Sequence, residues 1–148
     1  MSTEQHTQNT SGNTSGAVRL SVLNRQQQIA AVSMGVVAIA AFLPWVSVFG
    51  LSVAGIEGDG KLTLLAAFAG LAALAFGTDV IGRRKLPQPA YVAVSGIAGA
   101  VVAIVAIADM NEFAAFGLYL TLFGGVAWVA ALGWEFLEGR KAGSADAV

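Results

Sequence analysis

The stretch AYVAVSGIAGAVVAIVAIA, residues 90–108, decides the fold because it contains no charged residue over a length that can cross a membrane. At ~1.5 Å per residue, a helix of about 20 residues matches a hydrocarbon core of ~30 Å. Three more apolar stretches of similar or greater length lie at about 28–48, 62–81 and 113–137. The sequence therefore predicts an all-α integral membrane protein whose four spans form an antiparallel transmembrane bundle.

The composition agrees with one small membrane domain. The chain has 148 residues, of which 56% are hydrophobic and 11% charged, and its mean hydropathy is +0.71, whereas soluble domains carry roughly 25% charged residues. We assign residues 18–141 to this domain. Residues 1–17, rich in Ser, Thr, Asn and Gln, and residues 142–148 are expected to be disordered tails. The sequence has no Cys and no basic stripe, which excludes disulfides and argues against nucleic acid as a partner.

Basic residues are segregated along the chain, and this segregation predicts the orientation. Lys61 lies in the loop between the first two spans, whereas the other basic residues precede span one, separate spans two and three, or follow span four: Arg19, Arg25, Arg83, Arg84, Lys85, Arg140 and Lys141. Because cytoplasmic loops retain Lys and Arg, we expect a multi-pass protein of the cell membrane, or of a viral envelope, with both termini inside.

Small residues recur at intervals of four in three of the spans. In lipid, such residues let helix backbones approach closely, so each stripe is a candidate packing face. Packing within one chain is favoured over a dimer in so small a bundle. Leu118 is expected to lie off these faces. The predicted packing residues are Ala69, Ala73 and Gly77 in span two, Ser95, Gly99 and Ala103 in span three, and Gly117, Thr121 and Gly125 in span four.

Ionisable residues are expected only near the ends of the spans. Asp79 precedes Arg83 by four residues, which suits an interfacial ion pair. Glu135 and Glu138 lie close to Arg140 and Lys141 and are expected to pair at the same interface, an interpretation favoured over a proton relay. His6, the only His, falls in the predicted tail. We therefore expect no cofactor, no metal and no enzymatic activity.

The loop at 46–61 is the most individual segment. Residues 46–53 alternate apolar and small residues, which predicts a short β-hairpin outside the membrane, and the glycines at 55, 58 and 60 permit positive φ. Candidate partner-binding residues of this loop are Trp45, Phe49, Leu51 and Asp59. A cation site formed by Glu57, Asp59, Asp109 and Glu112 is an alternative, but the acidic residues lack the spacing of a calcium loop, and turn chemistry is favoured.

Residues 43–65 carry a family resemblance. The segments Leu43-Pro44-Trp45-Val46-Ser47, Ser52-Val53-Ala54-Gly55-Ile56 and Gly58-Asp59-Gly60 resemble a group of uncharacterised small four-span membrane proteins of archaea and actinobacteria. This resemblance implies the four-helix topology with an outer hairpin and implies no activity. The layout is also similar to that of claudin-like tetraspans, although the Cys pair of their first outer loop is absent here.

The predicted function is therefore non-enzymatic. We expect a structural or accessory membrane protein that contacts the lipid bilayer and a protein partner, or further copies of itself, through its helix faces and the 46–61 loop. The alternative is a small transporter or channel subunit that acts as an oligomer, against which the uncharged centres of the spans argue.

Overall fold

The computed structural model describes residues 22–81 and 86–145, and its main elements are four α-helices and one β-hairpin. In chain order these are α1 (Arg25–Ala40), β1 (Pro44–Val48), β2 (Leu51–Ala54), the 3-10 turn η2 (Gly55–Glu57), α2 (Gly60–Gly77), the 3-10 turn η3 (Asp79–Ile81), α3 (Gln88–Ala108) and α4 (Phe116–Ala145). Three of the helices, α2, α3 and α4, are long and apolar enough to cross a membrane. These features are consistent with a membrane protein.

Helix α1 is shorter than the first predicted span. It begins at a capping box, in which the Asn24 side chain accepts a hydrogen bond from the Gln27 backbone N–H and the Gln27 side chain accepts one from the Asn24 N–H. It ends at Ala40, before the end of the predicted span over 28–48, and residues 44–48 form strand β1. Pro44 has no backbone N–H and disfavours helix in the residue before it, which explains why the helix does not continue.

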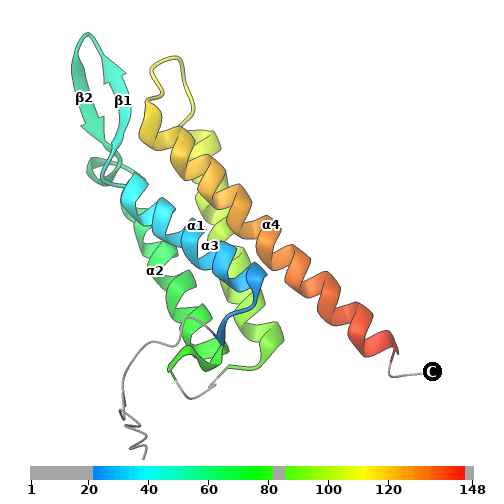
Figure 1. Ribbon diagram of the computed structural model, residues 1–148. Coiled ribbons are helices and arrows are strands. Elements are labelled where there is room, and N and C mark those ends of the chain that lie inside the picture. Colours follow the sequence, from blue (N-terminus) through cyan, green and yellow to red (C-terminus); the bar gives the residue numbers. More distant parts are fainter. Residues whose placement is uncertain (1–21, 82–85, 146–148) are drawn as a thin grey trace, which may run out of the picture.

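The four helices form a bundle in which each packs against its neighbour in the sequence and α1 also packs against α4. The most extensive packing joins α1 to α4 and α2 to α3, rather than α1 to α2. The β-hairpin projects from one end of the bundle, while the start of α1 and the end of α4 lie toward the other end (Figure 1).

The distribution of side chains suits a lipid environment. Large apolar residues are exposed on every helix, including Ile39 on α1, Leu65 on α2, Ile104 on α3 and Phe123 on α4. Several small polar residues are instead buried between the helices, namely Ser33, Thr63, Ser95 and Thr121. Because lipid does not reward burial of apolar surface, a membrane bundle is built from close packing and internal hydrogen bonds, as seen here.

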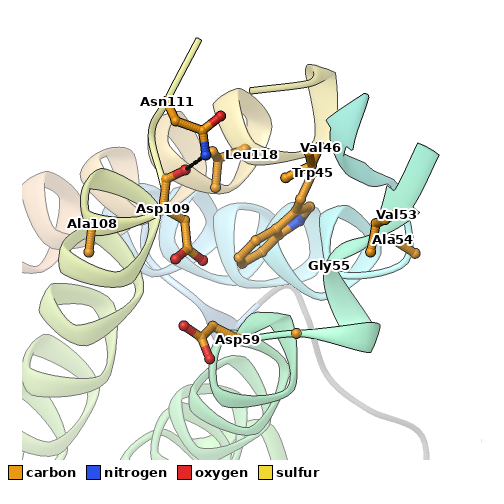
Figure 2. A pocket seen from close by; sticks show the side chains of 11 residues that line it. Trp45, Val46, Val53, Ala54, Gly55, Asp59, Ala108, Asp109, Asn111 and Leu118 are labelled. Atoms are coloured by element: carbon orange, nitrogen blue, oxygen red, sulfur yellow. Dashed lines mark hydrogen bonds between the residues drawn. The ribbon is translucent and has the colours of Figure 1, made fainter. Parts of the chain in front are cut away.

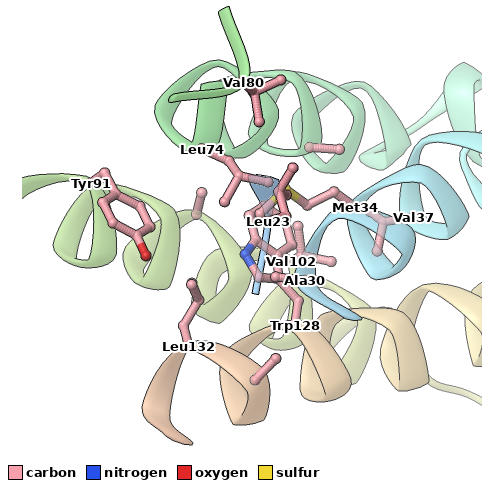
Figure 3. Close-up of a cluster of buried hydrophobic side chains, with 13 residues drawn as sticks. Leu23, Ala30, Met34, Val37, Leu74, Val80, Tyr91, Val102, Trp128 and Leu132 are labelled. Carbon is pink, nitrogen blue, oxygen red and sulfur yellow. The ribbon is translucent and has the colours of Figure 1, made fainter. Parts of the chain in front are cut away.

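Trp128 of α4 occupies the centre of the bundle. Its side chain is fully buried, and its Nε1 donates a hydrogen bond to Ser95 Oγ on α3 over 3.0 Å. Gly70 on α2 leaves room for the ring, because a Cβ atom there would lie 2.0 Å from Trp128 Cζ2. Figure 3 shows Trp128 among buried side chains from several helices, including Met34, Leu74 and Val102. Trp128 and Gly70 are absent from the predicted packing residues.

The predicted packing residues are distributed unevenly. Gly117, Thr121 and Gly125 of α4 are buried, as are Ser95 and Gly99 of α3 and Ala73 and Gly77 of α2. Ala103 is half-buried, whereas Ala69 lies on the exposed side of α2. The buried positions of α2 follow alternating intervals of three and four residues, which keeps them on one face of the helix, instead of the uniform interval of four that includes Ala69.

The ends of the predicted domain differ from the structure in one respect. Helix α4 continues to Ala145, so residues 142–145, expected in a disordered tail, are helical. The predicted tail at 1–17 and residues 146–148 lie outside the described residues.

Leu118, expected off the packing face, is fully buried against the cluster that contains Trp45 and Ala106.

Candidate functional site

The β-hairpin is regular and tightly turned. Strands β1 and β2 pair antiparallel, with Ser47 opposite Ser52 and Val48 opposite Leu51. The turn consists of Phe49 and Gly50, whose φ angles are 49° and 82°. Two consecutive residues with positive φ match the twist of a hairpin, and Phe49 is unusual in this conformation because it is not glycine. The hairpin predicted from residues 46–53 is therefore present.

The hairpin is attached firmly to the bundle through β1. Ser47 N–H donates to the Phe113 carbonyl over 3.0 Å, and Ala115 N–H donates to the Trp45 carbonyl over 2.7 Å. These bonds join β1 to the segment that leads into α4. The Trp45 ring is buried beneath the hairpin, and its Nε1 donates to the Ala40 carbonyl at the end of α1 over 3.0 Å. Trp45 thus fixes the base of the hairpin. Its burial means that its ring is not available to a partner, although Trp45 was one of the candidate partner-binding residues.

Two of the glycines that follow the hairpin, Gly55 and Gly60, allow close packing. A Cβ atom at Gly55 would lie 2.3 Å from Trp45 Nε1, and one at Gly60 would lie 2.4 Å from the carbonyl carbon of Gly55. Among the described glycines only Gly50 has positive φ. The glycines at 55, 58 and 60 permit positive φ but do not adopt it, and at Gly55 and Gly60 it is the lack of a side chain that matters.

The tip of the hairpin carries exposed apolar side chains. Phe49 is fully exposed, at 102%, and Leu51 is 78% exposed. Val53, two residues further along β2, is exposed by 46%. Phe49 and Leu51 are the most exposed apolar side chains of the hairpin, and hydrophobic residues that are exposed together gain free energy when they are covered. We define the hairpin tip as Phe49 and Leu51.

Behind the hairpin lies a cavity of about 360 Å³, and its lining includes Trp45, Asp59, Asp109 and Asn111. Figure 2 shows the carboxylates of Asp59 and Asp109 on facing sides of the cavity, beside the Trp45 ring. The structure thus brings together two of the four acidic residues of the alternative cation site, while Glu57 and Glu112 are exposed and do not line this cavity. In the described part of the chain, no group of three or more His, Cys, Asp and Glu residues could hold a metal.

The pKa of Asp109 is raised above its ordinary value, first by burial and second by the nearby carboxylate of Asp59. A raised pKa in the folded state means that protonation of Asp109 favours folding. This stabilisation by protonation is complete at a pH below the pKa that Asp109 has in the unfolded chain. It is lost as the pH rises through the higher pKa of Asp109 in the folded protein.

We therefore expect Asp109→Asn to raise the melting temperature at neutral pH. The melting temperature of this variant should also change less with pH in the acidic range than that of the wild type. Asp59→Asn, which removes only the second cause, should have the smaller effect. Thermal denaturation in detergent between pH 3 and pH 7, a range chosen around the ordinary Asp pKa of about 3.9, measures both. An unchanged pH dependence in Asp109→Asn would contradict the assignment.

A second polar cluster lies at the opposite end of the bundle, around Glu135 of α4. Glu135 is only 5% exposed. Its Oε1 accepts hydrogen bonds from Gln27 Nε2 of α1, over 2.8 Å, and from the Tyr91 hydroxyl of α3. Gln27 also donates to the Tyr91 hydroxyl over 3.1 Å. Glu135 is thus hydrogen-bonded to the first turns of α1 and α3, and these contacts are additional to its predicted role as an interfacial ion-pair partner.

The other predicted ion-pair residues remain at the surface. Glu138 is exposed and accepts hydrogen bonds from Gln26 Nε2 and, over 2.6 Å, from Trp134 Nε1. Arg140 lies over the Phe136 ring, with its guanidinium carbon 5.8 Å from the ring centroid. Asp79 is exposed at the start of η3, and its predicted partner Arg83 lies outside the described residues.

The chain matches no protein-family model, no curated protein and no solved structure in the three comparisons made with known proteins. The resemblance of residues 43–65 to small four-span membrane proteins therefore stays a prediction, and the function has to be argued from the residues and their arrangement.

Proposed function

We propose that this protein is a non-enzymatic structural or accessory membrane protein that crosses a cellular membrane or viral envelope four times and contacts a protein partner through its hairpin tip. The observation that carries the proposal is the full exposure of Phe49 at the tip of a hairpin that is itself anchored by backbone hydrogen bonds and by buried Trp45. A rigid element that presents apolar side chains loses little conformational entropy on binding.

The proposed fourth crossing is α1 together with the turn that follows it. With 16 residues, α1 spans ~24 Å, which is less than the ~30 Å of a typical hydrocarbon core. Its exposed side chains nevertheless continue the apolar surface of the other helices, with Val32, Ile39 and Phe42 each at least 60% exposed. Packing along α4 and α2 supports insertion beside them.

The distribution of charge supports the proposed orientation. Arg25 at the start of α1, together with Arg140 and Lys141 near the end of α4, belongs to the end of the bundle opposite the hairpin, whereas Lys61 begins α2 at the hairpin end. Positive residues favour the cytoplasmic side. We therefore place the hairpin outside and the ends of the chain inside.

Cysteine labelling tests this orientation, and the absence of native Cys makes the background clean. In intact cells, Ser52→Cys on the hairpin should react with a membrane-impermeant thiol reagent, while Gln88→Cys at the start of α3 should react only after the membrane is permeabilised. Both residues are exposed in the structure. Labelling of Gln88→Cys but not Ser52→Cys in intact cells would invert the topology.

Photo-crosslinking tests the partner contact. A photo-reactive phenylalanine analogue in place of Phe49 should yield a discrete crosslinked protein in the native membrane, and a Leu51→Ser change should reduce that product strongly. The control is Ser52→Ala, an exposed polar position of the same strand. Since surface substitutions usually change stability by less than about 0.5 kcal/mol, all variants should melt like the wild type. Absence of a discrete product, or equal yield from Leu51→Ser and Ser52→Ala, would contradict the proposal.

The alternative function, a small transporter or channel subunit acting as an oligomer, is favoured by one observation: Glu135 is a buried ionisable residue within a helix bundle. The proposed accessory function predicts that purified protein in sealed liposomes gives neither uptake driven by a pH gradient nor a channel current. A flux that disappears in Glu135→Gln and persists in Leu51→Ser would establish the alternative.

A further inference from the structure

The two oxygens of the Glu135 carboxyl group have very different surroundings. Oε1 accepts hydrogen bonds from Gln27 and Tyr91, and Gln27 is itself held by the capping box of α1. Oε2 is buried and has no hydrogen-bond partner among the described residues. A buried polar atom without a partner is energetically costly, more so for a charged group, so an unsatisfied carboxylate oxygen indicates a site for a hydrogen-bond donor.

Glu135 also lines a cavity of about 240 Å³ that is open to the surface at the inner end of the bundle. The other polar residues of its lining include Asn24, Thr78, Asp79 and Gln88. The described part of the lining therefore contains two carboxylates and no basic side chain. The two carboxylates of the described lining attract a cation.

The available oxygens favour an organic ammonium group over a metal ion. Calcium requires about six to eight oxygen ligands, and the described residues include no group of three or more His, Cys, Asp and Glu residues that could hold a metal. An ammonium group, in contrast, needs only one strong acceptor for each N–H, and charge-assisted hydrogen bonds are the strong ones. We propose that this cavity binds a primary ammonium group, which donates to Glu135 Oε2 and is attracted by the exposed carboxylate of Asp79.

The ammonium group could belong to a soluble amine or to the headgroup of phosphatidylethanolamine. The second source rests on the proposed membrane insertion, which puts the inner end of the bundle at the headgroup level. The chemistry recognised is the same, so the experiment must separate the sources.

The test measures the melting temperature of the full-length protein in detergent free of amine lipid. Methylammonium chloride should give a saturable rise in melting temperature, whereas NaCl and tetramethylammonium chloride at equal ionic strength should not, because they offer no N–H donor. Glu135→Gln should raise the half-saturation concentration of methylammonium by about tenfold or more, since it replaces a charged acceptor with a neutral one.

Glu138→Gln is the matched control, because it removes the same charge three residues further along α4, outside the cavity lining. It should bind methylammonium like the wild type. If Glu135→Gln does not fold, Asp79→Asn at the exposed edge should still weaken binding, by about two- to fivefold as expected for a solvent-exposed charge.

Nanodiscs then separate the two sources. If the lipid headgroup is the ligand, phosphatidylethanolamine should raise the melting temperature above that in phosphatidylcholine and remove the response to methylammonium. If a soluble amine is the ligand, the response should persist in both lipids. An equal rise with all three salts, or equal behaviour of the Glu135 and Glu138 variants, would overturn the proposal. None of these outcomes depends on the hairpin tip, so the partner proposal fails or succeeds separately.

Discussion

Trp45→Ala is expected to destabilise the protein by about 3–5 kcal/mol, the usual cost of removing a buried Trp or Phe side chain. Trp45 is 4% exposed and packs against Ala106 of α3 and Leu118 of α4, while its Nε1 bonds to the end of α1. One side chain thus joins three helices to the base of the hairpin. Its removal leaves a cavity that the surrounding backbone cannot fill, because β1 is held in place by hydrogen bonds to residues 113 and 115.

The control for this prediction is Trp134→Ala. Trp134 lies in α4 and, like Trp45, donates a hydrogen bond through Nε1, but its side chain is 58% exposed. We expect a loss of about 1 kcal/mol or less, since one exposed hydrogen bond and few packing contacts are removed. Thermal or denaturant unfolding in detergent compares the two. Similar losses in both variants would show that Trp45 does not anchor the hairpin.

The second large effect is expected from adding a single methyl group at Gly70. In Gly70→Ala the new Cβ would lie 2.0 Å from Trp128 Cζ2, far inside van der Waals contact. The ring has little freedom to move, because its Nε1 is bonded to Ser95 and a Cβ at Gly99 would be only 3.1 Å from Trp128 Cδ2. We expect destabilisation at or above the upper end of the range of about 1–3 kcal/mol usual for overpacking.

Gly96→Ala is the matched control for Gly70→Ala. Gly96 lies within α3, and a Cβ there would meet nothing within 4 Å. Because Ala is favoured over Gly in a helix interior, this change should stabilise the protein by about 0.5–1 kcal/mol. The two Gly→Ala variants should therefore shift the unfolding midpoint in opposite directions. Trp128→Phe should reduce the cost of Gly70→Ala, and independent effects of the two changes would argue against the contact.

The sequence alone was sufficient to predict a mostly helical chain with long apolar helices and a short hairpin. Long apolar stretches without charge are a local property of the sequence. The bounds of α2 and α3 were therefore predicted within a few residues at both ends, and those of α4 within a few residues at its start. The hairpin at 46–53 was also predicted, because alternation of apolar and small residues is local as well. Beyond Pro44, however, the apolar stretch continues with no change in composition, so the predicted first span extends to residue 48 although helix α1 ends at Ala40.

The tertiary structure decided which face of each helix is buried. In a soluble protein, the polar face of a helix reveals its apolar face, but here both sides of the helices are apolar and this signal is lost. Small residues occur on both sides of α2, so Ala69 could not be distinguished from Gly70 by type. The fit of Trp128 against Gly70 and of Tyr91 against Gly77 distinguishes the inner face.

The Asp59–Asp109 cavity and the Glu135 cluster likewise depend on the tertiary structure, because each combines residues that are distant in the sequence. Asp59 and Asp109 are separated by 50 positions in the sequence, and the loops that carry them meet only because the bundle closes. Glu135 and Glu138 both lie a few residues before Arg140, and nothing in the local sequence shows that one is buried and the other exposed. Burial of Glu135 results from the rotation of α4 about its axis, which is set by packing at Trp128 and Gly125, whereas helices long and apolar enough to cross a membrane are recognised from composition without knowledge of that rotation.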